Sequence, residues 1–244
     1  PLGRAYLFWT FVGAMAQVVA TMLLIRMFTL RNFGVGTMLT KSDVVITAIL
    51  GSLFFSERLS ALGVLALLVI LAGVVVMSLA RTPRAVLAGG RSQWLDGLFS
   101  QATRVALGCA LSFSISYLAL REATMATGEG SYLWRGAWTV LIAIAMQTVL
   151  VGGWLAAVEP AAFSQLRPNA KLCTFIGVTS AVGSIGWFTA FALQNASYVR
   201  AVGQIEVVFT LLISALYFRE RITAREYAGI ALAVLGVVMF RLGA

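Results

Sequence analysis

The chain has 244 residues, of which 60% are hydrophobic and 11% are charged. Soluble domains carry roughly 25% charged and 45–50% apolar residues, so this composition excludes an ordinary soluble domain. The net charge is +9 and there is no histidine, which excludes histidine triads and most transition-metal sites. The basic residues lie mainly in short gaps between apolar blocks, as in membrane proteins. The sequence therefore predicts no nucleic-acid partner, no metal and no cofactor.

Apolar windows of about 20 residues are long enough to cross a bilayer as helices. Eight such spans are predicted, at residues 5–30, 33–55, 60–80, 98–122, 131–156, 172–196, 199–218 and 225–243. The expected fold class is all-α, a polytopic helical membrane protein. The two longer linkers, 81–97 and 157–171, contain prolines. No phosphate-binding loop of the GxxxxGK[ST] type occurs, so nothing in the chain supports direct use of ATP.

An internal repeat is the most informative feature of the chain. Residues 28–77 align without a gap on residues 191–240, with 14 identities in 50 positions. The aligned polar residues are Asn32 with Asn195, Asp43 with Glu206, Thr47 with Thr210, and Glu57-Arg58 with Glu220-Arg221. The second copy starts five spans after the start of the first, and an odd number of spans reverses the direction of insertion. The sequence therefore predicts an inverted repeat, as in secondary transporters.

Each copy lies within a longer repeat unit, and the two units differ in their number of spans. The second unit, residues 98–244, has five spans. The first, residues 1–80, has three and is followed by the linker 81–97. We therefore expect two spans to be missing from the front of the first copy, and the intact protein to have ten. The chain also begins with Pro1 instead of methionine, which agrees with an N-terminal truncation.

The repeated segments resemble a known family. The stretch from Asn32 to Val76, with Ser-Glu-Arg-Leu-Ser at 56–60, looks like an EamA-type domain, and so does Asn195 to Met239, with Arg-Glu-Arg-Ile-Thr at 219–223. Two such domains in tandem are similar to members of the drug/metabolite transporter superfamily, over essentially the whole chain. The resemblance implies a ten-helix carrier of the bacterial inner membrane, with a central cavity formed by the first four helices of each half. It also implies cytoplasmic termini, whereas the distribution of arginines places the visible termini outside.

Polar residues form matching faces on two spans, because residues three or four apart share one side of a helix. The face on 199–218 carries Gly203, Glu206, Thr210, Ser214 and Tyr217. The face on 33–55 carries Thr40, Asp43, Thr47, Gly51 and Phe54. Acids inside a membrane usually face a bundle interior or an aqueous cavity, so we expect Asp43 and Glu206 to bind substrate or exchange protons. The alternative is that they form structural pairs with Lys41, Arg200 or another arginine.

Lys41 is the only lysine inside a span, and it lies about 200° around the helix from Asp43. A direct pair between these two is therefore not expected. Lys41 is instead a substrate or counter-ion contact, or a side chain that extends to the interface. The full predicted substrate or coupling site consists of Asp43, Glu206, Lys41, Thr40, Thr47, Thr210, Gln17, Gln147, Trp187 and Tyr217. The serines at 112–116 are expected to pack between helices, and Gly229 and Gly236 to form a packing or dimer contact.

The function that these features favour is secondary transport of a small polar or amphipathic metabolite, such as export of an amino-acid-like compound, by alternating access. The partners expected are a small-molecule substrate, the lipid bilayer, protons as the coupling ion, and a second copy bound through the last helix. No enzymatic activity is expected. The alternatives are a non-transporting scaffold or receptor, and an intramembrane enzyme.

Overall fold

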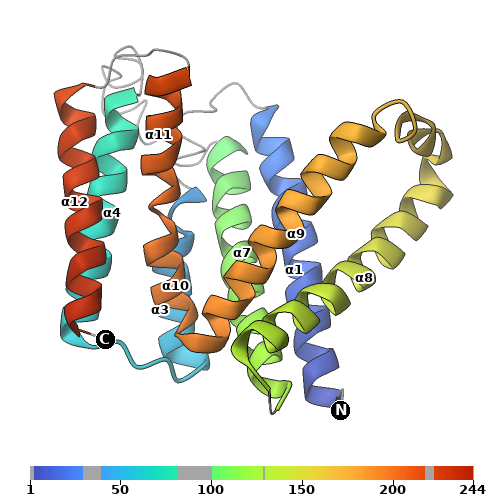
Figure 1. Cartoon of the computed structure of the whole chain (residues 1–244), viewed down its shortest axis with the longest axis horizontal. Helices are drawn as coiled ribbons and strands as arrows, with labels where there is room; N and C mark the ends of the chain where they lie inside the picture. Colours follow the sequence, from blue (N-terminus) through green and yellow to red (C-terminus); the bar gives the residue numbers. More distant parts are fainter. Residues whose placement is uncertain (1–2, 30–39, 82–100, 129, 218–222, 244) are drawn as a thin grey trace. The chain divides into compact units, whose positions relative to one another are not determined.

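The computed structural model describes residues 3–29, 40–81, 101–128, 130–217 and 223–243 (Figure 1). These residues form α-helices and one short 3₁₀ helix. The α-helices are α1 (Arg4–Phe28), α3 (Asp43–Phe54), α4 (Ala61–Arg81), α7 (Gln101–Ala126), α8 (Tyr132–Val158), α9 (Ala170–Leu193), α10 (Ala196–Gly203), α11 (Glu206–Tyr217) and α12 (Ala224–Gly243). The 3₁₀ helix η1 (Pro160–Gln165) connects α8 to α9. No strand occurs in these ranges.

Five helical segments are long and apolar enough to cross a membrane: Arg4–Met27, Gln101–Ala126, Tyr132–Val158, Ala170–Leu193 and Ala196–Ile213. Two further apolar helices, Asp43–Phe54 and Ala61–Met77, are shorter. Many large apolar side chains on these helices are exposed, such as Val149 and Phe175, as expected where lipid is the solvent. The predicted fold class, an all-α polytopic membrane protein, is thus confirmed, while eight as the number of spans stays a prediction.

The span predicted at 199–218 is not one continuous helix. It consists of α10 and α11, which are separated by a turn at Gln204–Ile205. At this turn the N–H of Gln204 donates to the carbonyl of Ala201, and the N–H of Ile205 to that of Val202, both at 3.1 Å. Bonds between residues three apart are 3₁₀ bonds, which tighten the backbone locally.

In the first repeat copy a turn lies at the equivalent place. Lys41 and Ser42 form this turn, and α3 begins at Asp43. These two residues align with Gln204 and Ile205 in the repeat. Each turn is followed by an acid in the first helical turn, Asp43 in α3 and Glu206 in α11. A carboxylate is favourable there because the N-terminus of a helix carries partial positive charge.

The chain divides into two compact units. The first comprises Pro1–Val19 and Ile115–Ala196, and the second Ala20–Ser114 and Ser197–Ala244. In the first unit α8 packs on α9, and a Cβ atom on Gly136 would lie 2.7 Å from the backbone nitrogen of Thr189. The domain limits predicted from the repeat describe a different division, by sequence similarity, and stay a prediction.

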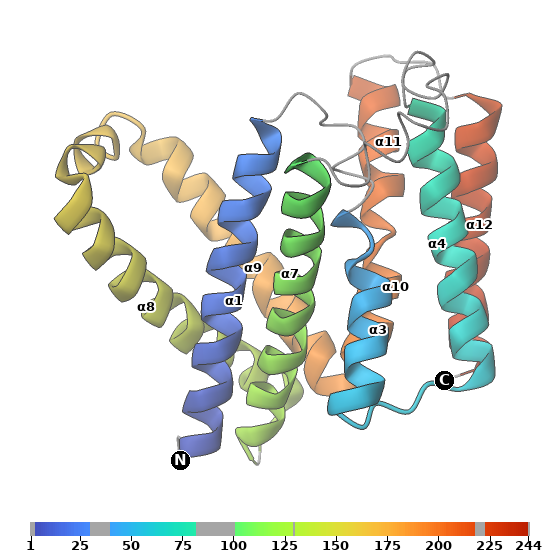
Figure 2. The ribbon, with the colours of Figure 1, turned by 180° about the vertical axis from the view of Figure 1, so that it is seen from behind.

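In the second unit α4 and α12 lie side by side (Figures 1 and 2). They run antiparallel, since Met77 faces Gly229 and Ile70 faces Gly236. A Cβ atom on Gly73 would lie 2.7 Å from both the nitrogen of Ala233 and the carbonyl oxygen of Gly229. Small residues therefore let these backbones approach closely, as in other membrane helix pairs. The packing alternative for Gly229 and Gly236 is confirmed.

The N-termini of α4 and α12 are capped differently although the repeat aligns them. At α12, Thr223 donates from its N–H to the carboxylate of Glu226 at 2.7 Å, and Glu226 donates back to the hydroxyl of Thr223. This reciprocal arrangement is a capping box. At α4 the position equivalent to Glu226 is Gly63, and the phenol oxygen of Tyr198 accepts from the N–H of Ser60 at 3.0 Å instead.

The contact between α4 and α12 makes Gly73 intolerant of a side chain. We expect Gly73→Ala to lower the free energy of unfolding by about 1–3 kcal/mol, because the new methyl group meets backbone atoms that cannot move aside cheaply. Gly177→Ala is the matched control, since nothing lies within 4 Å of a Cβ atom there, and alanine favours a helix by up to about 1 kcal/mol. Unfolding of both purified variants in one detergent measures the difference. Equal stability would contradict the close approach.

Candidate functional site

Asp43 and Arg200 form a buried ion pair. Asp43 is 3% exposed and Arg200 is 7% exposed. The Nη2 atom of Arg200 donates to Oδ2 of Asp43 at 2.6 Å. Ser114 on α7, also buried, donates its hydroxyl to the backbone carbonyl of Asp43 at 3.0 Å. Asp43 is thus held by a guanidinium from α10 and, through its backbone, by α7.

A second ion pair joins Lys41 to Glu206. The side chain of Lys41 is 27% exposed and that of Glu206 is 49% exposed. As predicted, Lys41 does not pair with Asp43. Both acids form ion pairs, and whether these pairs serve substrate binding or only structure stays a prediction. In each pair one residue comes from the first repeat copy and the other from the second.

Glu57 makes a third polar contact, at the end of α3. Ser56 has a φ of +52°, the left-handed conformation that commonly ends a helix, and the N–H of Glu57 donates to the carbonyl of Gly51 at 3.0 Å. The Glu57 carboxylate then accepts from the hydroxyl of Ser197 at 2.5 Å and from its N–H at 3.3 Å. Gly51 leaves room for this carboxylate, since a Cβ atom there would lie 2.7 Å from its Oε2 atom. Glu57 therefore caps the first turn of α10.

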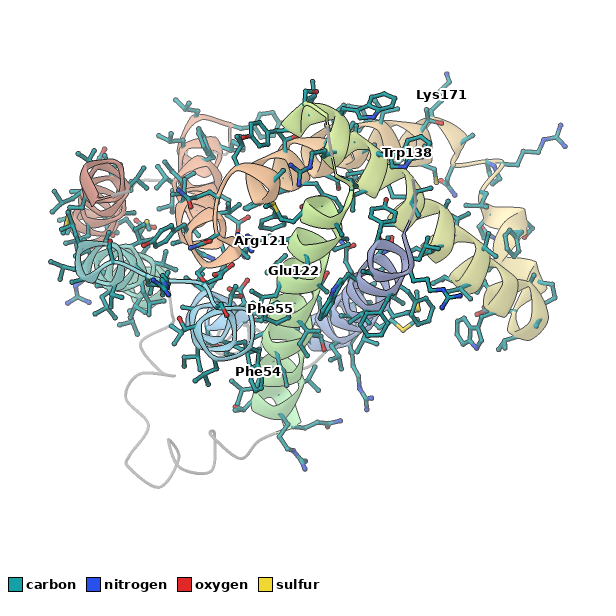
Figure 3. The ribbon with its side chains drawn as sticks, turned by 90° about the horizontal axis from the view of Figure 1, so that it is seen from below. Phe54, Phe55, Arg121, Glu122, Trp138 and Lys171 are labelled. Carbon is teal, nitrogen blue, oxygen red and sulfur yellow. The ribbon has the colours of Figure 1, made fainter. Side chains whose placement is uncertain are left out.

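The remaining predicted residues of the second unit differ in exposure. Thr47, one turn after Asp43 on the same face of α3, is fully buried, and Thr40 is half-buried. Tyr217 is 80% exposed at the end of α11. Phe54, its repeat equivalent, is 74% exposed and extends outward from α3 (Figure 3). The side chain of Thr210 lies outside the described part of the chain.

Three predicted residues lie in the first unit. The amide nitrogen of Gln147 donates to the side-chain oxygen of Gln17 at 3.0 Å and to the carbonyl of Ala14 at 3.1 Å. The structure thus brings the two glutamines together and links α1 to α8. Trp187 is half-buried, with its ring centroid 6.1 Å from that of Phe191.

Arg121 binds Asn195, one of the two asparagines that the repeat aligns. Arg121 and Glu122 are neighbours on α7 (Figure 3), and Nη1 of Arg121 donates to Glu122 at 3.2 Å. The same guanidinium donates to the side-chain oxygen of Asn195 at 3.1 Å and to the carbonyl of Gln194 at 3.2 Å. Arg121 therefore fixes the turn between α9 and α10, which is a structural role.

Two residues of the site were missed by sequence reasoning, Glu57 and Gln204. Glu57 contacts a residue 140 positions away in the chain, and a contact so distant has no local signal. Gln204 is 1% exposed, and its alignment with Lys41 was the only sequence signal for it. No group of three or more His, Cys, Asp or Glu side chains that could hold a metal occurs among the described residues.

The sequence profile of the EamA-like transporter family matches residues 102–242. No curated protein matches the chain. The matched region covers more than half of the chain, and it contains Arg200, Gln204 and Glu206.

Removing one charge of the buried Asp43–Arg200 pair should destabilise the protein more than removing both. We expect Arg200→Gln to destabilise the protein by about 3–5 kcal/mol, because the carboxylate of Asp43 is then buried without its counter-ion. The double variant Asp43→Asn/Arg200→Gln removes both charges and should recover a large part of this loss. Chemical unfolding in detergent measures all three values in one double-mutant cycle.

Arg167→Gln serves as the control, since Arg167 is exposed between η1 and α9 and should change stability by no more than about 0.5 kcal/mol. Additive losses from Asp43→Asn and Arg200→Gln would show that the two charges do not depend on each other.

Proposed function

Because the chain belongs to the EamA-like transporter family, we propose that it is a secondary transporter that exports a small zwitterionic metabolite, such as an amino-acid-like compound, by alternating access. The family consists of membrane transporters of the drug/metabolite superfamily. A transporter binds a small-molecule substrate and lies in a lipid bilayer, and the apolar helices make this chain an integral membrane protein.

The observation that carries the substrate class is the half-exposed ion pair of Lys41 and Glu206. A ligand that separates two opposite charges in a membrane must replace both partners, since an unpaired charge there is costly. A zwitterion does so with its carboxylate on Lys41 and its ammonium group on Glu206. A ligand of a single charge leaves one of the two residues unpaired, so the pair discriminates against it.

The two aligned turns, at Lys41–Ser42 and Gln204–Ile205, support alternating access. Discontinuous helices such as α10 and α11 are common at the midplane site of transporters built from inverted repeats, and a local 3₁₀ turn is a frequent hinge. Here each turn lies near one member of each ion pair. Rocking of one repeat copy against the other would therefore strain or release both pairs at once, which links occupation of the site to the movement of the copies.

Several finer features belong to the same proposal. They are the division into an incomplete first repeat and a complete second one, and a location in the bacterial inner membrane. Coupling to protons is a third feature. Glu206 would be the acid that exchanges the proton, because it is more exposed than Asp43. A homodimer through the last helix would have to use a face other than that of Gly229 and Gly236, because α4 covers these glycines.

The first test compares metabolites released by cells that make the unaltered protein or Glu206→Gln. We expect one class of zwitterions to accumulate outside only with the unaltered protein. Hydrogen bonds to charged groups are worth roughly 1.5–3 kcal/mol, so release should fall about ten- to a hundredfold in the variant. Untargeted mass spectrometry at matched membrane levels measures it. Glu159→Gln removes an exposed acid at the end of α8 and should leave release unchanged.

A charge exchange separates substrate binding from stability. Lys41→Glu/Glu206→Lys keeps an ion pair between the two helices, so we expect it to unfold at the temperature of the unaltered protein. The charges offered to a zwitterion are reversed, however, and release should stay as low as in Glu206→Gln. Full release by the exchanged variant would mean that the pair is only structural. Equal release by the unaltered protein and an empty control would refute export.

A further inference from the structure

Gln204 has a buried amide with no hydrogen-bond partner among the described residues. The residue is 1% exposed, and neither its oxygen nor its nitrogen is bonded. Oδ1 of Asp43 is likewise buried and unpartnered, although Oδ2 of the same carboxylate binds Arg200. Buried polar atoms in folded proteins nearly always have a partner, so each exception needs an explanation.

The repeat relates these two exceptions to each other. Gln204 aligns with Lys41, and Asp43 aligns with Glu206. Lys41 reaches Glu206 from one helix to the other. The repeat counterpart of that ion pair is therefore Gln204 with Asp43, in which an amide stands where the other copy has an ammonium group.

The charge state of Asp43 limits what a site shared by Asp43 and Gln204 can bind. The guanidinium of Arg200 already neutralises Asp43, so a further cation or anion at this place would be buried without a counter-ion, which is costly. The unsatisfied atoms of Asp43 and Gln204 are two acceptors, Oδ1 and Oε1, and one donor, Nε2 of Gln204. A water molecule can donate to both acceptors and accept from Nε2, whereas a hydroxyl group can donate to one acceptor and accept from Nε2.

Thr47 extends this pattern along α3. Its hydroxyl is buried and has no partner among the described residues. Thr47 lies one helical turn after Asp43, and residues four apart are neighbours on a helix surface. A hydroxyl group both donates and accepts, so it adds to the same set of atoms without adding charge.

We propose that Gln204 and Asp43 form a second subsite, next to the Lys41–Glu206 pair, which binds an uncharged hydroxyl-type group. Water supplies this group when the transporter is empty, and a hydroxyl of the substrate supplies it when the transporter is loaded. The substrate arm of this inference rests on the proposed function. If the subsite binds a substrate hydroxyl, the preferred substrate is a zwitterion with a hydroxyl group on its side chain.

The substrate arm is tested with Gln204→Leu in proteoliposomes, with radiolabelled serine and alanine as probes that differ by one hydroxyl group. We expect the unaltered protein to prefer serine. In Gln204→Leu, serine uptake should fall by about tenfold or more, as expected for the loss of one well-placed hydrogen-bonding group, while alanine uptake is retained. Gln165→Leu makes the same chemical change at an exposed position and should alter neither.

The water arm does not depend on transport. Hydroxyl radicals generated by a short X-ray pulse modify buried side chains only where water is bound beside them. We expect the peptide that carries Asp43 and Thr47 to be labelled in the unaltered protein and in Gln165→Leu, and to lose this labelling in Gln204→Leu. Mass spectrometry of the digested protein measures the yield.

The outcomes are distinguishable. An unchanged ratio of serine to alanine together with unchanged labelling in Gln204→Leu would overturn the subsite. Loss of labelling with an unchanged ratio would support water alone and overturn the substrate arm. If the unaltered protein carried neither amino acid, the proposed function would fail for this class of compound, and the labelling would decide the subsite by itself.

Discussion

A charge inside a bilayer is stable only beside an opposite charge or a full set of hydrogen bonds. This requirement organises the second unit of the protein. Asp43 belongs to the first repeat copy and Arg200 to the second, and they meet at 2.6 Å. Lys41 and Glu206 are divided between the copies in the same way. Asp43 and Glu206 thus each pair with a basic residue of the other copy, and these two ion pairs link the copies in a low-dielectric surrounding.

The two ion pairs differ in what it costs to open them. Asp43 and Arg200 are almost completely buried, so separating them leaves two desolvated charges. Lys41 and Glu206 are partly exposed, so a small ligand can reach both charges and replace each partner without uncovering a buried group. The exposed pair can therefore exchange its partners with the charged groups of a substrate, while the buried pair stays closed and stabilises the helices.

Apolar windows predicted the membrane helices, and the repeat with the helical spacing of polar residues predicted the two aligned acids and the absence of a Lys41–Asp43 pair. The turns before α3 and α11 were harder to predict. Gly203 lies directly before the second turn, but none of the four turn residues, Lys41, Ser42, Gln204 and Ile205, is a proline or a glycine, which are the usual local signals for the end of a helix. The contact of Glu57 with Ser197 was missed because it depends on how distant segments pack, which spacing along one helix does not report.

The different caps of α4 and α12 have a consequence for position 63. A Cβ atom there would lie 2.4 Å from the phenol oxygen of Tyr198, so any side chain at 63 would have to displace the tyrosine that accepts from the N–H of Ser60. The acceptor for this N–H is supplied by α10 and not by α4 itself, and the size of residue 63 and the start of α4 are therefore coupled to the position of α10.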